Sequence, residues 1–274
     1  MLRRLLKHEF RATGRVMLPM IAILLAASVA ANLSLRYLMD SRAWFLSMVG
    51  GLLMVAFVVA IIAVFVVAFV LMVQRFYKNL LQDEGYVMLT LPVSIHQHIW
   101  SKLIVSSVWF VVTALAVFLA CCVTAFDISV IKEILWGLGR VLEELRKVQA
   151  YYAINGTAIV IETIVLCFLA LVAMCLQFYA ALAAGHSLPS HKMAWSVAWY
   201  FGLQFVFQII GVGVIQILDQ TGFFEWGIFH PNVHLDVMAG IHIGMGLLIL
   251  STVVYGAIFY AITTFFLKKR LNLE

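Results

Sequence analysis

Six long apolar stretches dominate the pattern of hydrophobic and polar positions along the chain. Each is close to or above the roughly 20 residues of helix that cross the ~30 Å hydrocarbon core of a bilayer. The expected fold is therefore an all-α polytopic membrane protein with six transmembrane helices. We place the spans near residues 16–36, 45–73, 102–126, 160–184, 193–218 and 240–267, and expect the second helix to continue as far as Gln82.

The polar connections contain two amphipathic patterns. In residues 1–15 apolar positions share one helical face, and basic residues occupy the rest. This favours an interfacial helix with its apolar side in the headgroups, although a basic start before an apolar run is also typical of a signal peptide. Residues 129–149 predict a helix lying on the outer leaflet or against the bundle, with a substrate-sensing surface as the alternative. Residues 219–239 are rich in Gly, Phe, Trp and His, which is consistent with a partly re-entrant segment.

The distribution of Lys and Arg predicts the orientation of the chain. Of the 18 basic residues, twelve fall on the side that holds the N-terminus, residues 75–102 and the C-terminus, and six fall on the other side. Basic residues concentrate in cytoplasmic segments. Both termini and residues 75–102 are therefore predicted to be cytoplasmic, and residues 127–159 and 219–239 extracellular.

Composition supports the membrane class and narrows the partners. Hydrophobic residues make up 65% of the chain and charged residues 11%, with a mean hydropathy of +1.06, whereas soluble domains are about 25% charged. The net charge of +5 is explained by basic cytoplasmic segments, so the lipid bilayer is the expected surrounding and nucleic acid is not an expected partner. The four cysteines all lie inside apolar runs and are interpreted as buried small hydrophobes.

Residues that carry chemistry are sparse. The chain has no glycine-rich phosphate loop ending in Gly-Lys-Ser/Thr and no His-Glu-x-x-His pair, so it is not expected to bind ATP through such a loop. Pro231 favours a break at His230, so hydrogen bonding is the preferred interpretation for the polar residues around it. We expect no catalytic residue, metal or cofactor bound by this chain. The residues with some metal-ligand character are His230, His234, Asp236 and His242.

Three polar residues fall inside or near predicted spans. Glu162 either reaches the outer headgroups or serves a function within the membrane, because intramembrane acids are commonly functional. Gln204 and Gln208 share a helical face in the fifth span. Amides in membrane helices form interhelical contacts, so these two predict either a subunit interface or the lining of a pathway.

The connection between the second and third spans, residues 75–102, has the features of a rigid knob. Gly85 permits a helix to end there, and Pro92 disfavours helix at the residue before it. Ser94, with a glutamine three residues later, has capping-box spacing and predicts a new helix start. The short apolar patch over residues 86–91 suits docking to a partner; an ordinary connector is the alternative.

This connection contains, in order, Asp83-Glu84, Gly85, Leu89-Thr90-Leu91-Pro92-Val93-Ser94 and, at the start of the next span, Lys102. In these residues it resembles the first cytoplasmic loop of type-two ABC-exporter permeases. The six spans and the basic N-terminal helix match as well. Ala184-Gly185-His186 and His191-Lys192 resemble the second inner loop of bacterial members. Ile95-His96 stand where many members place Arg or Lys directly after the Leu-Pro-x-Ser unit, which argues against a basic contact at that position.

This resemblance implies a permease subunit of an ATP-driven exporter in the bacterial cytoplasmic membrane. It implies two partners: a second permease subunit, identical or different, and a separate ATPase subunit that binds the ATP. Closure of the ATPases would push the loop and open the pathway outward, for a substrate that the resemblance does not specify. The residues expected to couple to the ATPase are Lys78, Asp83, Glu84, Gly85, Tyr86, Met88, Leu89, Leu91, Pro92, Ser94 and His96.

Two other classes of function remain open. A non-transporting membrane scaffold or immunity protein would have the same composition but no ATPase partner. A membrane-embedded enzyme acting on lipid or peptide through Glu162 or the outer histidines would need several polar residues converging within the membrane, and the sequence shows only scattered ones.

Overall fold

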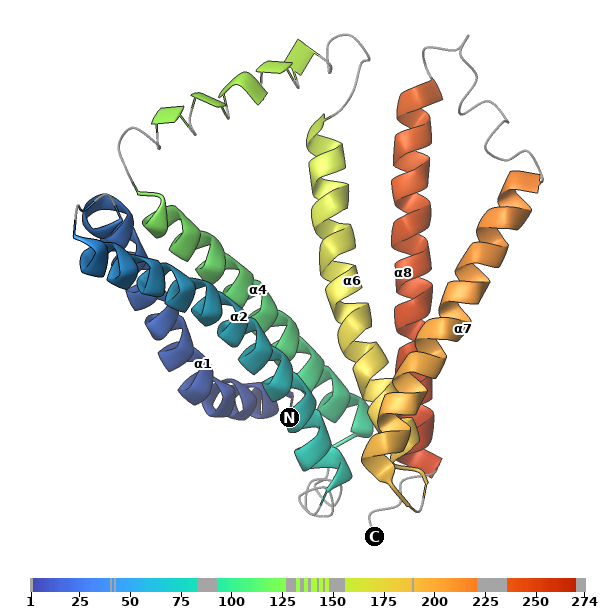
Figure 1. Ribbon diagram of the computed structural model, residues 1–274. Coiled ribbons are helices and arrows are strands. Elements are labelled where there is room, and N and C mark those ends of the chain that lie inside the picture. The colour runs from blue at the N-terminus through green and yellow to red at the C-terminus, as the bar shows by residue number, and fades with distance from the viewer. Residues whose placement is uncertain are drawn as a thin grey trace. The chain divides into compact units, whose positions relative to one another are not determined.

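A computed structural model shows six long helices, each apolar and long enough to cross a membrane. Among the described residues the chain is a multi-pass, all-α protein without strands, which confirms the predicted fold class. The structure describes residues 2–274 except 40, 42, 83–92, 127–131, 134–135, 138, 142, 145, 148–155, 189, 221–235 and 270–274, and the side chains of 218 and 236–240. The elements are α1 (Leu2–Leu33) with the π-helical turn η1 (Ser34–Leu38), α2 (Trp44–Leu81), α4 (Ile95–Thr124), α6 (Gly156–Gly185), α7 (Lys192–Gln220) and α8 (Asp236–Lys269) (Figure 1).

The predicted N-terminal interfacial helix is continuous with the first span. Residues 2–15 and the apolar run that follows form the single helix α1, which contains Pro19. A proline inside a helix removes one backbone donor and commonly produces a bend, and the ribbon of α1 changes direction in its N-terminal half (Figure 1). The amphipathic character holds at the residue level, because Leu5 and Phe10 are half-buried while Lys7 and Arg11 are exposed.

Two helices extend well beyond the apolar cores that the sequence marks. α2 has 38 residues, about 57 Å at 1.5 Å per residue, which is nearly twice the hydrocarbon thickness. Its last residue is Leu81, in agreement with the predicted extension. α4 begins at Ile95, seven residues before the expected span. The helices flanking residues 83–92 therefore continue as rigid rods past the ends of the predicted spans.

The chain divides into two compact units. The first comprises Met1–Asn79 and Met88–Leu138, and the second comprises Leu80–Val87 and Gly139–Glu274. In the first unit α1 packs along α4. Met17, Leu24 and Ala31 of α1 are fully buried at intervals of seven residues, the spacing of a stripe facing a neighbouring helix.

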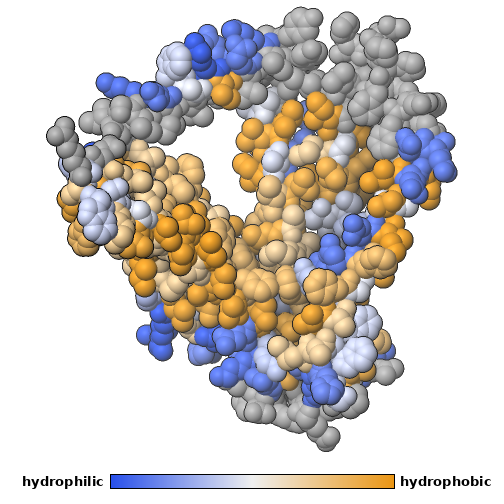
Figure 2. Space-filling view, viewed as in Figure 1, coloured by the Kyte–Doolittle hydropathy of each residue, from blue (hydrophilic) through white to orange (hydrophobic). Residues whose placement is uncertain are grey.

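In the second unit α6 packs against both α7 and α8. The last turns of α6 are rich in buried alanines, among them Ala180 and Ala184, and small side chains allow neighbouring backbones to approach closely. Most large apolar side chains of α7 remain exposed, as expected for a helix surrounded by lipid. Figure 2 shows hydrophobic residues along the middle of the helices and hydrophilic ones toward their ends.

The two predicted extracellular segments are described only in part. All described residues between 132 and 147 are helical and nearly all are exposed; most are charged, among them Lys132, Glu144 and Lys147, while Trp136 and Val141 are exposed apolar residues. This agrees with the predicted amphipathic helix, whose apolar positions lie outside the described residues. Most of the segment 219–239 also lies outside them.

Candidate functional site

The loop predicted to couple to an ATPase lies largely outside the described residues, and its flanks are visible. Lys78 is exposed in the last turn of α2, where a basic side chain complements the helix dipole. His96 is exposed in the first turn of α4. The predicted residues outside the described range are Asp83, Glu84, Gly85, Tyr86, Met88, Leu89, Leu91 and Pro92.

Ser94 caps α4, as its spacing predicted. Its backbone is extended, with φ −69° and ψ 146°, and its side chain accepts a hydrogen bond from the backbone N–H of Gln97 at 3.4 Å. A cap of this kind satisfies one of the N–H groups that a helix start leaves unpaired, typically worth about 1 kcal/mol. The start of α4 is therefore fixed by local sequence.

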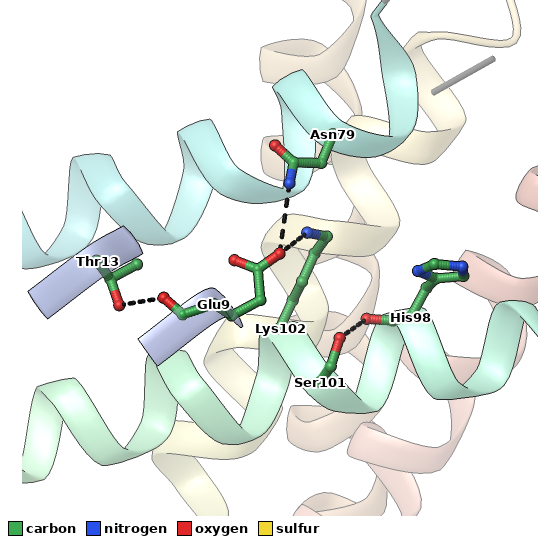
Figure 3. A network of polar contacts seen from close by, with 6 residues as sticks. All are labelled: Glu9, Thr13, Asn79, His98, Ser101 and Lys102. Carbon is green, nitrogen blue, oxygen red and sulfur yellow. Dashed lines mark hydrogen bonds and ion pairs between the residues drawn. The ribbon is translucent and has the colours of Figure 1, made fainter. Parts of the chain in front are cut away.

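On the helices that flank the loop in sequence, a buried polar cluster joins α1, α2 and α4. Glu9 Oε1 accepts a hydrogen bond from Lys102 Nζ at 2.8 Å and a second from Asn79 Nδ2 at 3.3 Å (Figure 3). The three residues are between 2% and 5% exposed, so water cannot replace these partners. We call Glu9, Asn79 and Lys102 the polar junction.

The polar junction fixes three helix ends at one level. Glu9 is in the second turn of α1, Asn79 is in the last turn of α2, and Lys102 is in the second turn of α4. An unpaired buried charge is strongly destabilising, so α1 and α4 cannot separate here without leaving Glu9 and Lys102 uncompensated, and α2 is joined to them by the Asn79 hydrogen bond. The cluster thus ties the N-terminal helix to both helices that lead into the loop.

Of these three residues, the sequence pattern singled out only Lys102, at the start of a predicted span. Glu9 is an isolated acid within a strongly basic helix, and this contrast in charge is the sequence feature that could have indicated a special role for it. Asn79 carried no distinguishing pattern. Its proximity to Glu9 depends on how α1 and α2 are packed, which no local pattern encodes.

A second polar contact continues the α1–α4 interface. Trp109 Nε1 donates a hydrogen bond to Thr13 Oγ1 at 2.7 Å, and Thr13 donates to the carbonyl of Glu9 at 2.8 Å. The indole lies close to the neighbouring Gly14, where a Cβ would make an ordinary contact 3.5 Å from Trp109 Cζ2. The indole is therefore held against α1 by both a hydrogen bond and close packing.

The polar junction borders a cavity within the same unit. It is small, with room for about one water molecule. Apolar side chains alternate around it with charged and hydroxyl groups, so it is a mixed site near the boundary between the polar and apolar parts of the helices. We call it the junction cavity; it is lined by Glu9, Thr13, Met17, Ala68, Leu71, Met72, Arg75, Lys102, Val105, Ser106 and Trp109.

At their opposite ends α1 and α4 are also fastened by side chains. Asn32 Nδ2 donates to the carbonyls of Thr124 and Phe126 at 3.0 and 3.2 Å, and Arg36 donates to that of Phe126 as well. The last carbonyls of a helix have no partner within it. Side chains of the first span thus complete the hydrogen bonding at the end of α4.

The two glutamines of the fifth span behave differently from one another. Gln204 Oε1 accepts a hydrogen bond from Gln177 Nε2 of α6 at 2.9 Å, so its interhelical contact is made within this chain. Gln208 is exposed on α7. A contact between Gln208 and another subunit stays a prediction.

The structure brings Glu162 together with a histidine from another helix. His242 Nδ1 on α8 lies 2.8 and 3.0 Å from the two carboxylate oxygens of Glu162 on α6. Each residue is six positions from the start of its helix, about 9 Å at 1.5 Å per residue. Both side chains are about 30% exposed, at 31% and 27%. The pair lies toward the helix starts, which favours an interfacial position for Glu162.

The histidines that suggested a metal site do not form one among the described residues, where no group of three potential ligands converges. His230 and His234 lie outside the described range. His242 is engaged with Glu162 instead, in agreement with hydrogen bonding as the preferred interpretation of that residue.

The connection between α6 and α7 is unusually tight. A Cβ on Gly185 would lie 2.2 Å from Ser196 Oγ and 2.5 Å from Ser196 Cα, so no larger residue fits. His186, only 2% exposed, has Nδ1 2.9 Å from the carbonyl of Leu182. Desolvation by burial lowers the pKa of His186, and the charge of Lys192 lowers it further, against the opposing effect of the Leu182 hydrogen bond.

No known protein family, curated protein or solved structure matches this chain.

Proposed function

We propose that the chain is the permease subunit of an ATP-driven ABC exporter, coupling a separate ATPase to transport across the bacterial cytoplasmic membrane. The observation that carries the proposal is the polar junction, which ties α1 to α2 and α4, the two helices that flank the predicted coupling loop in sequence. The resemblance of residues 83–102 to exporter permeases, together with six helices of membrane-crossing length, supports the same function.

The geometry suits the transmission of a mechanical push. α2 and α4 extend as continuous helices beyond the predicted spans and flank residues 83–92. A force applied to that loop reaches helix ends that are locked to one another through Glu9. Because buried ion pairs resist separation, α1 and α4 would move together when the ATPase closes, with α2 linked to them through Asn79.

A separate chain is needed to bind ATP, because this sequence contains no phosphate loop. Asp83, Glu84 and the apolar residues 86–91 would face a groove on that chain, with Lys78 and His96 at its edge. A second permease subunit, identical or different, would complete the pathway. Gln208, exposed on α7, is available for that contact or for lining the pathway.

The test is co-purification followed by an activity measurement. The tagged chain, extracted from native membranes, should retain a protein that carries a phosphate loop, and ATP hydrolysis should belong to the complex rather than to this chain alone. Met88→Ala with Leu89→Ala should reduce retention of the ATPase by more than tenfold, because truncating central apolar anchors costs on the order of 2 kcal/mol. Glu84→Gln, a rim charge, should cost less than about 1 kcal/mol.

Equal membrane levels of both variants are the control for folding. Undiminished retention of the ATPase by the double variant would assign the loop to a simple connector. Purification without any ATPase subunit under mild extraction would instead favour a non-transporting scaffold or immunity protein.

A further inference from the structure

The N-terminal half of α1 carries a row of exposed basic side chains that the polar junction does not use. Its members recur every four residues, a spacing that places them on one face of the helix. We call them the basic row; they are Arg3, Lys7, Arg11 and Arg15, and all four are exposed. Within the described part of the chain they make no hydrogen bond or ion pair. Like charges at this spacing repel one another, so the basic row favours an anion beside it.

The opposite side of the same helix is occupied by protein. Glu9 is buried there against Lys102 of α4 (Figure 3). Thr13 accepts a hydrogen bond from Trp109 of the same helix, and Met17 is fully buried. An interfacial helix would lay this side into the headgroups, but here α4 covers it. The side that α1 can offer to lipid near its start is therefore the basic one.

On the same face, the basic row continues directly into an exposed apolar row. Apolar residues follow Arg15 at intervals of three, four, seven and four positions, and all are exposed: Leu18, Ala22, Val29 and Leu33. Exposed apolar side chains on a helix that crosses a membrane face the acyl chains. The basic row therefore starts where the hydrocarbon ends, at the depth of the lipid headgroups. A soluble acidic partner would have to displace lipid to reach Arg15, so this position favours a lipid as the anion.

We propose that Arg11 and Arg15 bind the phosphate of an anionic phospholipid in the leaflet at the N-terminal end of α1. The two residues are about 6 Å apart along the helix axis, so both guanidinium groups can reach one headgroup. Each guanidinium presents two parallel N–H donors that match a phosphate. Leu18, which is 62% exposed and one turn after Arg15, contacts the start of an acyl chain. This site is independent of the proposed transport function.

The experiment is native mass spectrometry of the purified full-length chain, titrated with phosphatidylglycerol or with phosphatidylcholine of the same acyl chains. We expect the first phosphatidylglycerol to bind at least about tenfold more tightly, because each basic residue near the headgroups contributes roughly fivefold. Arg11→Gln combined with Arg15→Gln should lower that preference at least about fivefold. The charge-matched control is Arg3→Gln combined with Arg4→Gln. It removes two exposed cations from the same helix, at least about 10 Å farther from the hydrocarbon than Arg11, and should preserve the preference within about twofold.

Three results would overturn the proposal. An absence of preference in the wild type would leave the basic row to an acidic protein surface. An equal loss in the two double variants would mean attraction by the total charge of the helix. Displacement of the lipid by millimolar inorganic phosphate would assign the arginines to a free anion. Leu18→Ala provides a second test that keeps every charge: weaker binding of both lipids with an unchanged preference supports the site, and unchanged affinity for both refutes it.

Discussion

The polar junction makes a quantitative prediction that separates a structural ion pair from an incidental one. Lys102→Met removes the ammonium 2.8 Å from Glu9 Oε1 and leaves the carboxylate in a site where only 5% of its side chain is exposed. The amide of Asn79, at 3.3 Å, remains as a side-chain donor to it. Breaking a buried pair in this way typically costs about 3–5 kcal/mol, so we expect a loss in that range.

A double replacement isolates the contribution of the charge. Glu9→Gln combined with Lys102→Met removes both charges and keeps side chains of similar volume, so the combined loss should fall to about 1 kcal/mol. The double variant should therefore be less destabilised than Lys102→Met alone, which corresponds to a coupling energy of at least about 2 kcal/mol between the two positions; additive losses would give zero. Asn79→Ala alone should cost about 1 kcal/mol, the usual contribution of one hydrogen bond.

The assay is reversible unfolding of the purified chain in mixed micelles of a mild detergent and increasing dodecyl sulfate, followed by helical circular dichroism. Lys7→Met is the matched control, because Lys7 is an exposed lysine on α1 and its replacement should change the free energy of unfolding by less than about 0.5 kcal/mol. A loss below 1 kcal/mol for Lys102→Met, or strictly additive losses in the double variant, would refute the reasoning.

Three further predictions concern the other connections. Gly185→Ala should prevent folding or cost several kcal/mol in the same unfolding assay, because its Cβ would lie 2.4 Å from the backbone nitrogen of Ser196; Gly202→Ala, with no neighbour within 4 Å of its Cβ, should be nearly neutral. Burial lowers the folded-state pKa of His186 below its ordinary value of 6.5, so the free energy of unfolding should be greatest above pH 6.5 and fall as the pH is lowered from 6.5 toward the folded-state pKa. His186→Gln should lose this dependence, and an identical pH profile in both proteins would contradict it. A single cysteine at position 83 should be protected from a membrane-impermeant thiol reagent in intact cells, and its labelling would reverse the predicted orientation.

Much of the fold follows from local sequence. The six apolar runs determine six helices because a backbone within hydrocarbon must satisfy its own hydrogen bonds, and a helix does so without any distant partner. The start of α4 was likewise predictable, since Ser94 and Gln97 supply the cap between themselves. The end of α2 near residue 82 followed from the continued helical pattern before Gly85. Each of these features depends on residues within a few positions of one another.

The local sequence pattern did not correctly predict a boundary between the interfacial helix and the first span. The change from an amphipathic to an apolar pattern near residue 15 marks where the surroundings change. It does not interrupt the backbone hydrogen bonding, so residues 2–33 form one helix with Pro19 inside it.

Only the tertiary structure determined the sites. Glu9 and Lys102 are separated by 93 positions, and Glu162 and His242 by 80, so no spacing along the chain could pair them. The same holds for Gln204, whose face was predictable but whose partner, Gln177 on α6, was not. A helical pattern specifies which face of a helix is polar or apolar. Which helix meets that face depends on long-range packing. The role of an isolated acid such as Glu9 is therefore defined only when that packing places a cation beside it.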